Sequence, residues 1–184
     1  MLLNPLVLSS VFRLPNTKGE SEDFRSKIKE EARIKTIGEL LYVIRRMKKL
    51  HDTKPITDLC LFKEGVEPMW EDPQNISGGK WILKIKKDTV DQRLFEKLMV
   101  WLAAVPFQTM EVNGIVVSVR GYQTILSLWT KTCPERDEKI EQEKEIRSML
   151  GLKTAIIVAF KGNEESMKDR SSFRNVLKEK EEEE

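Results

Sequence analysis

The arrangement in this chain best suited to bind a ligand is a tryptophan next to a carboxylate, with a glycine pair and a lysine shortly after. Trp70 and Glu71 lie in Glu67-Pro68-Met69-Trp70-Glu71-Asp72, and Gly78-Gly79-Lys80-Trp81 follows. An indole face attracts a flat cation with about 0.5–2 kcal/mol, and a carboxylate can accept two parallel N–H bonds. These residues therefore favour a flat, positively charged purine with exposed N–H donors. The alternative is a core tryptophan beside a solvated acid.

The other polar residues do not form a catalytic pattern. His51, the only histidine, lies in a polar loop, and the residues around it do not form a serine, cysteine or acid pattern that suggests a nucleophile. Glu71 and Asp72 are adjacent, and in an extended segment their side chains diverge, so no catalytic carboxylate pair is expected. Gly78-Gly79 lacks the continuation of a phosphate-binding P-loop. We predict neither an enzyme nor a metal site nor a bound cofactor.

Composition and charge narrow the class of protein. The chain has 184 residues, enough for one sizeable core, and we expect a single domain over residues 1–177. Charged residues make up 34% of it, but the formal net charge is only +2, so any nucleic-acid site must be local. Residues 178–184 are acidic and of low complexity, which predicts a disordered tail.

The sequence predicts neither a membrane segment nor a secretion signal. Residues 1–12 are apolar but short, without a basic n-region, which favours a first strand over a signal peptide. No apolar run is long enough to span a bilayer. Cys60 and Cys133 show no metal spacing or secreted disulfide pattern, which favours reduced thiols. We therefore expect a soluble cytoplasmic protein, with the nucleus as a second compartment, and no membrane partner.

The elements that must position Trp70 and Glu71 are strands mixed with helices, which predicts an α+β fold. Alternation and short apolar runs predict strands over residues 6–14, 24–34, 59–62, 81–85, 115–120, 125–129 and 154–160, with an added edge strand over 170–177. We expect Asn113-Gly114 to form the turn that precedes residue 115.

Three helices are expected between the strands. The spacing of Thr36 and Glu39 predicts a capping box at the start of the first helix. A second capping box over residues 89–92 precedes an apolar stripe. Pro134 is expected in the first turn of the third helix, with Gly151 at its end.

Several segments carry a family resemblance when they are taken together. They are Leu61-Phe62-Lys63-Glu64-Gly65-Val66-Glu67-Pro68-Met69-Trp70-Glu71-Asp72, Asn75, Gly78-Gly79-Lys80-Trp81, Gly114-Ile115-Val116-Val117-Ser118-Val119-Arg120 and Ser127-Leu128-Trp129-Thr130. In this order they resemble the eukaryotic cap-binding translation factors, the initiation factor 4E family, over roughly residues 4–160. The resemblance implies a single curved antiparallel β-sheet backed by three α-helices. It also implies that a slot on the concave face binds the 7-methylguanine of the mRNA 5′ cap.

The resemblance further implies that the methylated base stacks between two aromatic rings, of which Trp70 is one. The family's second stacking tryptophan matches Phe24 here, whose ring is smaller and has a weaker quadrupole. Phe12 is the alternative, in which case Phe24 is a buried strand residue. Glu71 matches the carboxylate that binds the base edge, and Trp129 the tryptophan near the 7-methyl group.

The same resemblance assigns the cap phosphates to Arg120 and Lys80. A guanidinium suits a phosphate chain because its donors are fixed in a fork; the alternative for Arg120 is a solvated residue at a strand end. The lysine that the family usually has five residues after this arginine is Ile125 here, which is similar to the divergent branch that represses translation. Residues 168–170 either replace the missing charge or form a mobile charged loop.

For its partners, the resemblance implies capped mRNA and, on the convex face, a helical peptide from a scaffold initiation factor or a repressor. The family centres this peptide on a tryptophan that matches Leu41 here. We expect a reshaped site around Ile37, Leu41 and Val100. The function predicted is cap binding in translation initiation. The alternatives are a cap-binding translational repressor and an interaction module on the same fold that does not bind caps.

Overall fold

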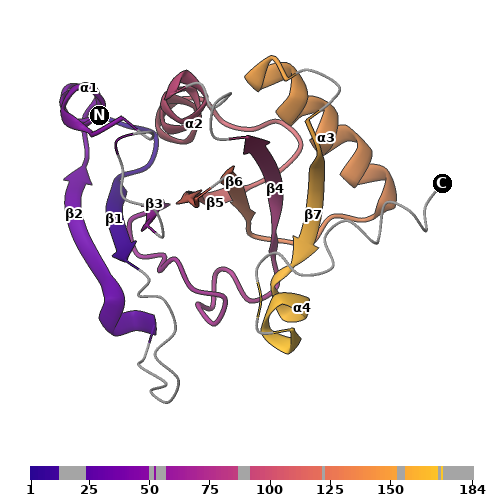
Figure 1. Cartoon of the computed structure of the whole chain (residues 1–184). Coiled ribbons are helices and arrows are strands. Elements are labelled where there is room, and N and C mark those ends of the chain that lie inside the picture. The colour runs from indigo at the N-terminus through magenta and orange to yellow at the C-terminus, as the bar shows by residue number, and fades with distance from the viewer. Residues whose placement is uncertain are drawn as a thin grey trace.

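The framework of the molecule is one antiparallel sheet of seven strands, in the order β2-β1-β3-β5-β6-β4-β7 (Figure 1). The structure, a computed structural model, describes residues 1–12, 24–49, 52, 57–86, 92–121, 123–152, 156–169 and 171. The strands are β1 (Leu6–Phe12), β2 (Ile28–Ile34), β3 (Thr57–Lys63), β4 (Gly79–Lys86), β5 (Val112–Val119), β6 (Gln123–Thr130) and β7 (Val158–Gly162). Helices α1 (Ile37–Arg46), α2 (Gln92–Ala104) and α3 (Arg136–Leu150) lie along one face. The expected curved sheet backed by three helices is confirmed.

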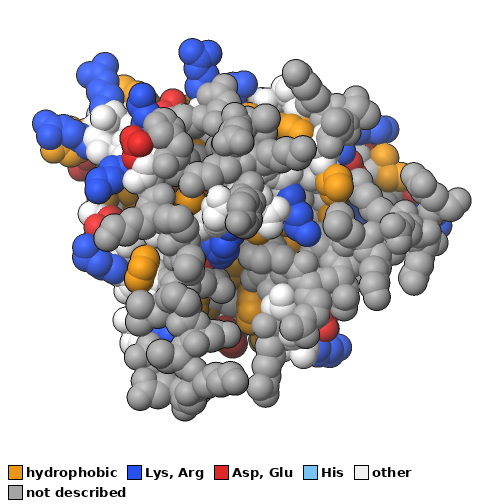
Figure 2. Space-filling view, in the orientation of Figure 1, with side chains coloured by type: hydrophobic (Ala, Val, Ile, Leu, Met, Phe, Trp, Pro, Cys, Tyr) orange, Lys and Arg blue, Asp and Glu red, His pale blue; other side chains and the backbone are white. Residues whose placement is uncertain are grey.

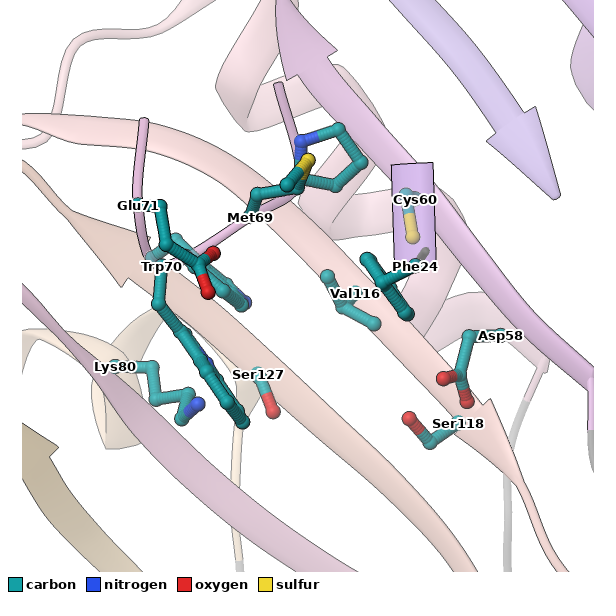
Figure 3. A pocket seen from close by; sticks show the side chains of 12 residues that line it. Phe24, Asp58, Cys60, Met69, Trp70, Glu71, Lys80, Val116, Ser118 and Ser127 are labelled. Carbon is teal, nitrogen blue, oxygen red and sulfur yellow. The ribbon is translucent and has the colours of Figure 1, made fainter. Parts of the chain in front are cut away.

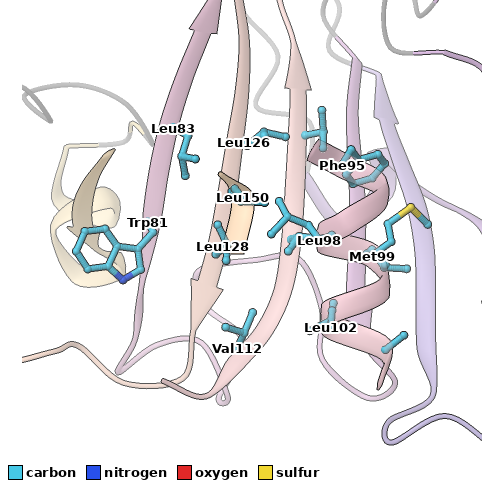
Figure 4. Close-up of a cluster of buried hydrophobic side chains, with 14 of the residues drawn as sticks. Trp81, Leu83, Phe95, Leu98, Met99, Leu102, Val112, Leu126, Leu128 and Leu150 are labelled. Atoms are coloured by element: carbon cyan, nitrogen blue, oxygen red, sulfur yellow. The ribbon is translucent and has the colours of Figure 1, made fainter. Parts of the chain in front are cut away.

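The core fills the space between this face and the helices. Successive side chains of a strand point to opposite faces of a sheet. Trp81 and Leu83 of β4 are therefore buried in the same cluster as Phe95 of α2 (Figure 4). Lys80 and Ile82, which alternate with them, point to the opposite, concave face. The alternation thus separates a helix-covered core from a face that is available to a ligand.

The capping box predicted for α1 is confirmed. The Thr36 hydroxyl accepts the N–H of Glu39 at 3.2 Å, and a Glu39 carboxylate oxygen accepts the N–H of Thr36 at 3.0 Å. The same oxygen accepts the N–H of Lys35 at 2.7 Å. These backbone bonds, from Lys35 first and then from Thr36, lower the pKa of the Glu39 carboxyl. The helix therefore begins where the sequence predicts.

The start of α3 lies later than predicted. Glu135 is the N-cap, because the Glu138 side chain accepts its N–H at 2.9 Å, and Arg136 is the first helical residue. Pro134 therefore precedes the cap and does not lie in the first turn. The predicted end is confirmed: Gly151 is the C-cap with φ of 63°, a left-handed conformation that favours glycine.

The second predicted strand, over residues 24–34, is wrong over its first four residues. Phe24–Lys27 form a short 3₁₀ helix, η1, and β2 begins at Ile28. Arg25 in this turn forms an ion pair with Glu67, which lies in the connection between β3 and β4, with 2.6 Å between the charged atoms. A contact made far along the chain thus accompanies the departure from the local strand pattern.

The predicted turn at Asn113-Gly114 is also wrong, because both residues belong to β5. The register with β6 shifts between Val112 and Gly114, which accommodates the irregularity. A Cβ atom on Gly114 would lie 2.4 Å from the ring of Phe62 on the neighbouring strand. This glycine therefore permits a close approach between strands, and it does not serve a turn.

The C-terminal part differs from the prediction as well. The last described strand runs over Val158–Gly162 and not over 154–160, and a fourth, short helix, α4 (Asn163–Lys168), follows it. Lys168 and Asp169, predicted as replacement charges or a mobile loop, therefore end a helix. The edge strand expected over 170–177, the tail over 178–184 and the capping residues 89–91 lie outside the described residues, except for residue 171. Among the described helices, none is both long and apolar enough to cross a membrane.

Candidate functional site

The concave face holds a cavity of about 170 Å³ between the sheet and the connection from β3 to β4 (Figure 3). Its lining combines aromatic and apolar side chains with a few polar ones: Phe24, Asp58, Cys60, Pro68, Met69, Trp70, Glu71, Lys80, Val116, Ser118, Ser127 and Trp129. Five residues predicted to contact a nucleotide from sequence are among them, namely Phe24, Trp70, Glu71, Lys80 and Trp129. Arg120 is not in the lining but pairs with a residue that is.

One wall of the cavity, which we call the Trp70 wall, is the connection over residues 64–78. The Trp70 ring stands nearly edge-on in Figure 3, with the open cavity between it and Phe24. The Glu71 carboxylate lies on the cavity side of this ring and is exposed. Asp72 faces its own loop instead, since its carboxylate accepts the N–H of Glu67 at 2.9 Å and of Gln74 at 2.8 Å. The two adjacent acids thus have separate roles.

Buried asparagines brace the Trp70 wall from behind. The Asn75 side chain donates to the carbonyls of Glu67 at 2.8 Å and Met69 at 2.9 Å. Asn113 of β5 donates to the carbonyl of Gln74 at 2.6 Å and to the Asn75 side chain at 3.1 Å. Asn163 of α4 donates to the Asn75 carbonyl at 2.8 Å. All three asparagines are at most 1% exposed, so buried side chains fix the backbone on both sides of Trp70.

The opposite side, the Phe24 wall, is η1. Phe24 is half-buried and packs on the small apolar cluster of the concave face, which includes Cys60 and Trp129. Its neighbour Arg25 forms the ion pair to Glu67 described above, and the side chains of this pair are 65% and 45% exposed. Phe12, the alternative stacking residue, is 49% exposed at the end of β1 and is not among the described lining residues.

Trp129 and Lys80 close the inner end of the cavity. They are directly opposed on β6 and β4. The Trp129 ring meets the edge of Phe62 at 5.5 Å between centroids, and its indole N–H has no hydrogen-bond partner among the described residues. The ammonium of Lys80 lies 4.7 Å from the Trp129 ring centroid and 5.0 Å from that of Trp70, and Lys80 is 1% exposed. This lysine is therefore a buried cation that contacts both indoles.

The other end of the cavity is polar. Asp58 on β3 and Ser118 on β5 are opposed in the sheet, and both side chains line the cavity. Arg120 forms an ion pair with Asp58 at 2.8 Å and donates to the Val119 carbonyl at 3.0 Å, so its guanidinium is held at this end. Ile125, directly across from Ser118, is 3% exposed. Arg120 and Lys80 thus lie at opposite ends of the cavity.

Sequence reasoning missed the polar lining residues and the asparagine brace. Asp58 and Cys60 lie two positions apart on β3. Ser118 lies on β5 and Ser127 on β6, and each has apolar neighbours along its strand. Small or polar residues spaced by two on predicted neighbouring strands were the available signal for a lined concave face. The brace gave no such signal, because Asn75, Asn113 and Asn163 are far apart in the sequence.

The three residues predicted to bind a partner lie on the helical side. Ile37 is 54% exposed, Leu41 48% and Val100 39%. The N-terminal segment joins the two helices that carry them, since the N–H of Leu2 donates to the Lys35 carbonyl at 3.0 Å and that of Leu3 to the Ala103 carbonyl at 3.1 Å. Figure 2 shows hydrophobic side chains beside lysine and arginine side chains over α1. The convex face therefore exposes apolar side chains with basic neighbours.

Comparison with known proteins connects this geometry to one family. The model of the family described as eukaryotic initiation factor 4E matches residues 8–178. Translation initiation factor 4E-4 of Caenorhabditis elegans is 29% identical over 92% of this chain and 80% of its own length. Translation initiation factor NCBP of Triticum aestivum is 33% identical over 95% and 75%. The solved complex of C. elegans eIF4E-3 with the 4E-binding protein Mextli and cap analog superimposes with a TM-score of 0.76, at 21% identity, over 91% of this chain and 94% of that one.

Proposed function

The chain belongs to the eukaryotic initiation factor 4E family, and we propose that it binds the 7-methylguanosine cap of messenger RNA and acts in translation initiation. The observation that carries this proposal is the cavity in which Trp70 and Phe24 face each other, with the Glu71 carboxylate beside the gap. A cationic purine between the rings gains stacking and cation–π attraction. Glu71 accepts the two N–H donors of its Watson–Crick edge.

The other lining residues support one orientation of the ligand, with its base and its phosphates at different ends of the cavity. The methylated base lies at the aromatic end, where Trp129 contacts the 7-methyl group, and the phosphates extend toward Arg120. Asp58 holds the Arg120 guanidinium in place and also offsets part of its charge. Lys80, which the sequence also assigned to the phosphates, lies buried against Trp70 and Trp129 at the aromatic end, so in this orientation the phosphates are proposed for Arg120. The ligand is bound and released without covalent change, so the protein is not an enzyme, and it acts in the cytoplasm, where mRNA is translated.

The test is a titration of tryptophan fluorescence with 7-methyl-GTP and with GTP. We expect 7-methyl-GTP to bind much more tightly, because only its base is cationic. Glu71→Gln removes the charge that accepts the base edge and lowers the binding free energy by about 1–3 kcal/mol. Glu141→Gln, an exposed acid of α3, is the matched control and leaves the affinity unchanged. Equal affinity for the two nucleotides would contradict the proposed function.

Ile125 favours a second candidate, a cap-binding translational repressor. It is 3% exposed and packs with Ile82 and Ala159, so the polar end lacks the cation that the family usually places here. A cap held with few phosphate contacts suits a protein that occupies caps without recruiting a scaffold. The candidates differ in whether the cap-bound protein captures a scaffold peptide. Ile125→Lys tests the phosphate argument: it strengthens 7-methyl-GTP binding more than 7-methylguanosine binding if this position faces the phosphates.

For the protein partner, we propose a helical peptide of a scaffold factor or a repressor, docked on the convex face around Ile37, Leu41 and Val100. Their exposure supports this placement. Leucine lacks the indole N–H and the width that make tryptophan a frequent hot spot, so standard docking peptides bind poorly. Calorimetry with a consensus docking peptide on the wild type and on Leu41→Trp measures this, and we expect tighter binding by the variant. Submicromolar binding by the wild type would contradict the reshaped site.

A further inference from the structure

We infer that the hydroxyls of Ser118 and Ser127 form a neutral phosphate subsite on the floor of the cavity, where they donate hydrogen bonds to the phosphate chain of the cap. This inference rests on the proposed function, since it concerns the phosphates of the same ligand. It assigns to two uncharged side chains a part of the contacts that a second cation would otherwise make.

The two serines lie between the aromatic end and the polar end of the cavity. Ser127 is two residues from Trp129 on β6, and Ser118 is two residues from Arg120. Side chains two residues apart in a strand point to the same face, so both serines share the concave face with the residues at the two ends. Both line the cavity, and Figure 3 shows Ser118 beside Asp58, with Ser127 nearer the opposite end.

The register of the sheet sets the spacing of the two serines. Ser127 is directly opposed to Val116 on β5, and Ser118 is the next residue of β5 on the same face. The serines are therefore diagonal neighbours, which lie about 7–8 Å apart in an antiparallel pair. A phosphate chain that runs from a base beside Trp129 toward Arg120 passes over both of them.

Both serines are buried, but the protein leaves their hydroxyls open to a ligand. Ser118 is 2% exposed and Ser127 is 3% exposed, and neither hydroxyl makes a hydrogen bond to any of the described residues. By contrast, the hydroxyl of Thr130, on the same strand as Ser127, donates to the Thr132 carbonyl at 2.9 Å. Buried polar groups in proteins are generally hydrogen-bonded. Two such hydroxyls on a cavity floor therefore indicate a polar ligand, and a phosphate oxygen can accept from each.

The charges at the polar end favour a contribution from neutral donors. Arg120 forms an ion pair with Asp58 at 2.8 Å, which offsets part of its charge. Ile125, directly opposed to Ser118, is 3% exposed and occupies the position where the family usually has a lysine. Because phosphate oxygens are ionised, a hydrogen bond from a serine hydroxyl to one of them is charge-assisted. The serines thus hold the phosphates where the lysine is missing.

The experiment compares 7-methyl-GTP with 7-methylguanosine, which has the same base and ribose but no phosphate, by calorimetry. For Ser118→Ala and for Ser127→Ala, we expect 7-methyl-GTP to bind about three- to tenfold more weakly, whereas 7-methylguanosine binds as it does to the wild type. The loss should be the same at low and at high salt, because the donor carries no charge. Ser9→Ala is the matched control and leaves both affinities unchanged, because Ser9 is opposed to Cys60 on the same face of the sheet but is not among the lining residues.

Each outcome decides the question. An unchanged affinity for 7-methyl-GTP in either variant overturns the inference while leaving cap binding intact. Equal weakening of both ligands assigns the hydroxyls to the base or the ribose and also overturns it. If an alanine variant does not fold, Ser118→Cys or Ser127→Cys takes its place with the same expected loss, because a thiol is a weak donor of similar size. If the wild type binds neither ligand, the proposed function fails, and the inference falls with it.

Discussion

Each of the two walls of the cavity carries one aromatic ring, but the two walls are held by different kinds of contact. The Trp70 wall is fixed by three asparagines that are at most 1% exposed and that bond to the backbone on both sides of the ring. The Phe24 wall is a single 3₁₀ turn, joined to the Trp70 wall by an ion pair whose side chains are 65% and 45% exposed. A buried polar group that loses its hydrogen bond destabilises the fold, whereas an exposed ion pair contributes about 0–1 kcal/mol to stability.

The difference indicates which part of the site exists before a ligand arrives. The Trp70 wall is preorganised, so binding does not have to order it. The described link from the Phe24 wall to the Trp70 wall, the ion pair of Arg25 and Glu67, is exposed and adds little to the position of η1. Substitutions in the brace should therefore affect stability and affinity together, whereas substitutions in η1 should affect affinity alone.

The largest effect is expected from breaking the brace. Asn75→Ala removes the donors to the Glu67 and Met69 carbonyls, and we expect a loss of about 2–4 kcal/mol in the free energy of unfolding. Among the molecules that remain folded, 7-methyl-GTP should bind at least several-fold more weakly, because Trp70 and Glu71 are no longer fixed. Urea unfolding and fluorescence titration measure the two quantities, with Asn113→Ala as a milder variant.

Gln142→Ala is the control for this prediction. Gln142 is a buried amide of α3 that accepts the indole N–H of Trp81 at 2.9 Å and donates to the Thr109 carbonyl at 3.2 Å, away from the cavity. Its loss should destabilise the protein without changing the affinity of the folded molecules. If Asn75→Ala also left that affinity unchanged, the asparagines would support only the fold.

The next effect concerns the two rings themselves. Trp70→Ala should lose about 1–3 kcal/mol of binding free energy for 7-methyl-GTP, and Phe24→Ala clearly less, because its ring is smaller and has a weaker quadrupole. Trp101→Ala, on α2, removes an indole that packs near Phe107, and it should not change binding. A greater loss for Phe24→Ala than for Trp70→Ala would reverse the comparison.

A smaller gain is expected from enlarging the weaker wall. Phe24→Trp restores the residue type that the family has at this position, and it should strengthen 7-methyl-GTP binding by about 0.5–1 kcal/mol through greater stacking area and a stronger quadrupole. Calorimetry should show no comparable gain for GTP. Weaker binding by the variant would mean that η1 lacks the room for an indole.

The smallest effect is expected from the ion pair between the walls. Glu67→Gln should weaken 7-methyl-GTP binding by less than about 1 kcal/mol, and the difference from wild type should vanish at high salt. Glu64→Gln is the matched control, since Glu64 belongs to the same connection but pairs with Arg33 at 3.2 Å, away from η1. An effect that persists at 1 M salt would contradict a role for the charge of Glu67.

Much of the site was predictable because the segments that carry the family resemblance contain its residues. Trp70, Glu71, Lys80 and Trp129 were named from sequence, and the structure brings them into one cavity with Phe24. Arg120 was named as well, but its pairing with Asp58 was not. The predicted turn at Asn113 failed because a turn dipeptide was judged by local preference, whereas packing against Phe62 decides that Gly114 lies in a strand.

By itself, the sequence determined the α+β class, the capping box of α1, the end of α3 and the aromatic and acidic residues of the cavity. Each depends on residues close in the chain, where periodicity and backbone bonding are decided locally. The tertiary structure alone decided that Asn113 and Asn163 brace the Trp70 wall, that η1 departs from its strand pattern beside Glu67, and that Lys80 contacts the rings of both Trp70 and Trp129. Each of these depends on atoms brought together from distant segments, and no local pattern encodes such contacts, whether they are buried, as for the asparagines, or exposed, as for the ion pair of η1.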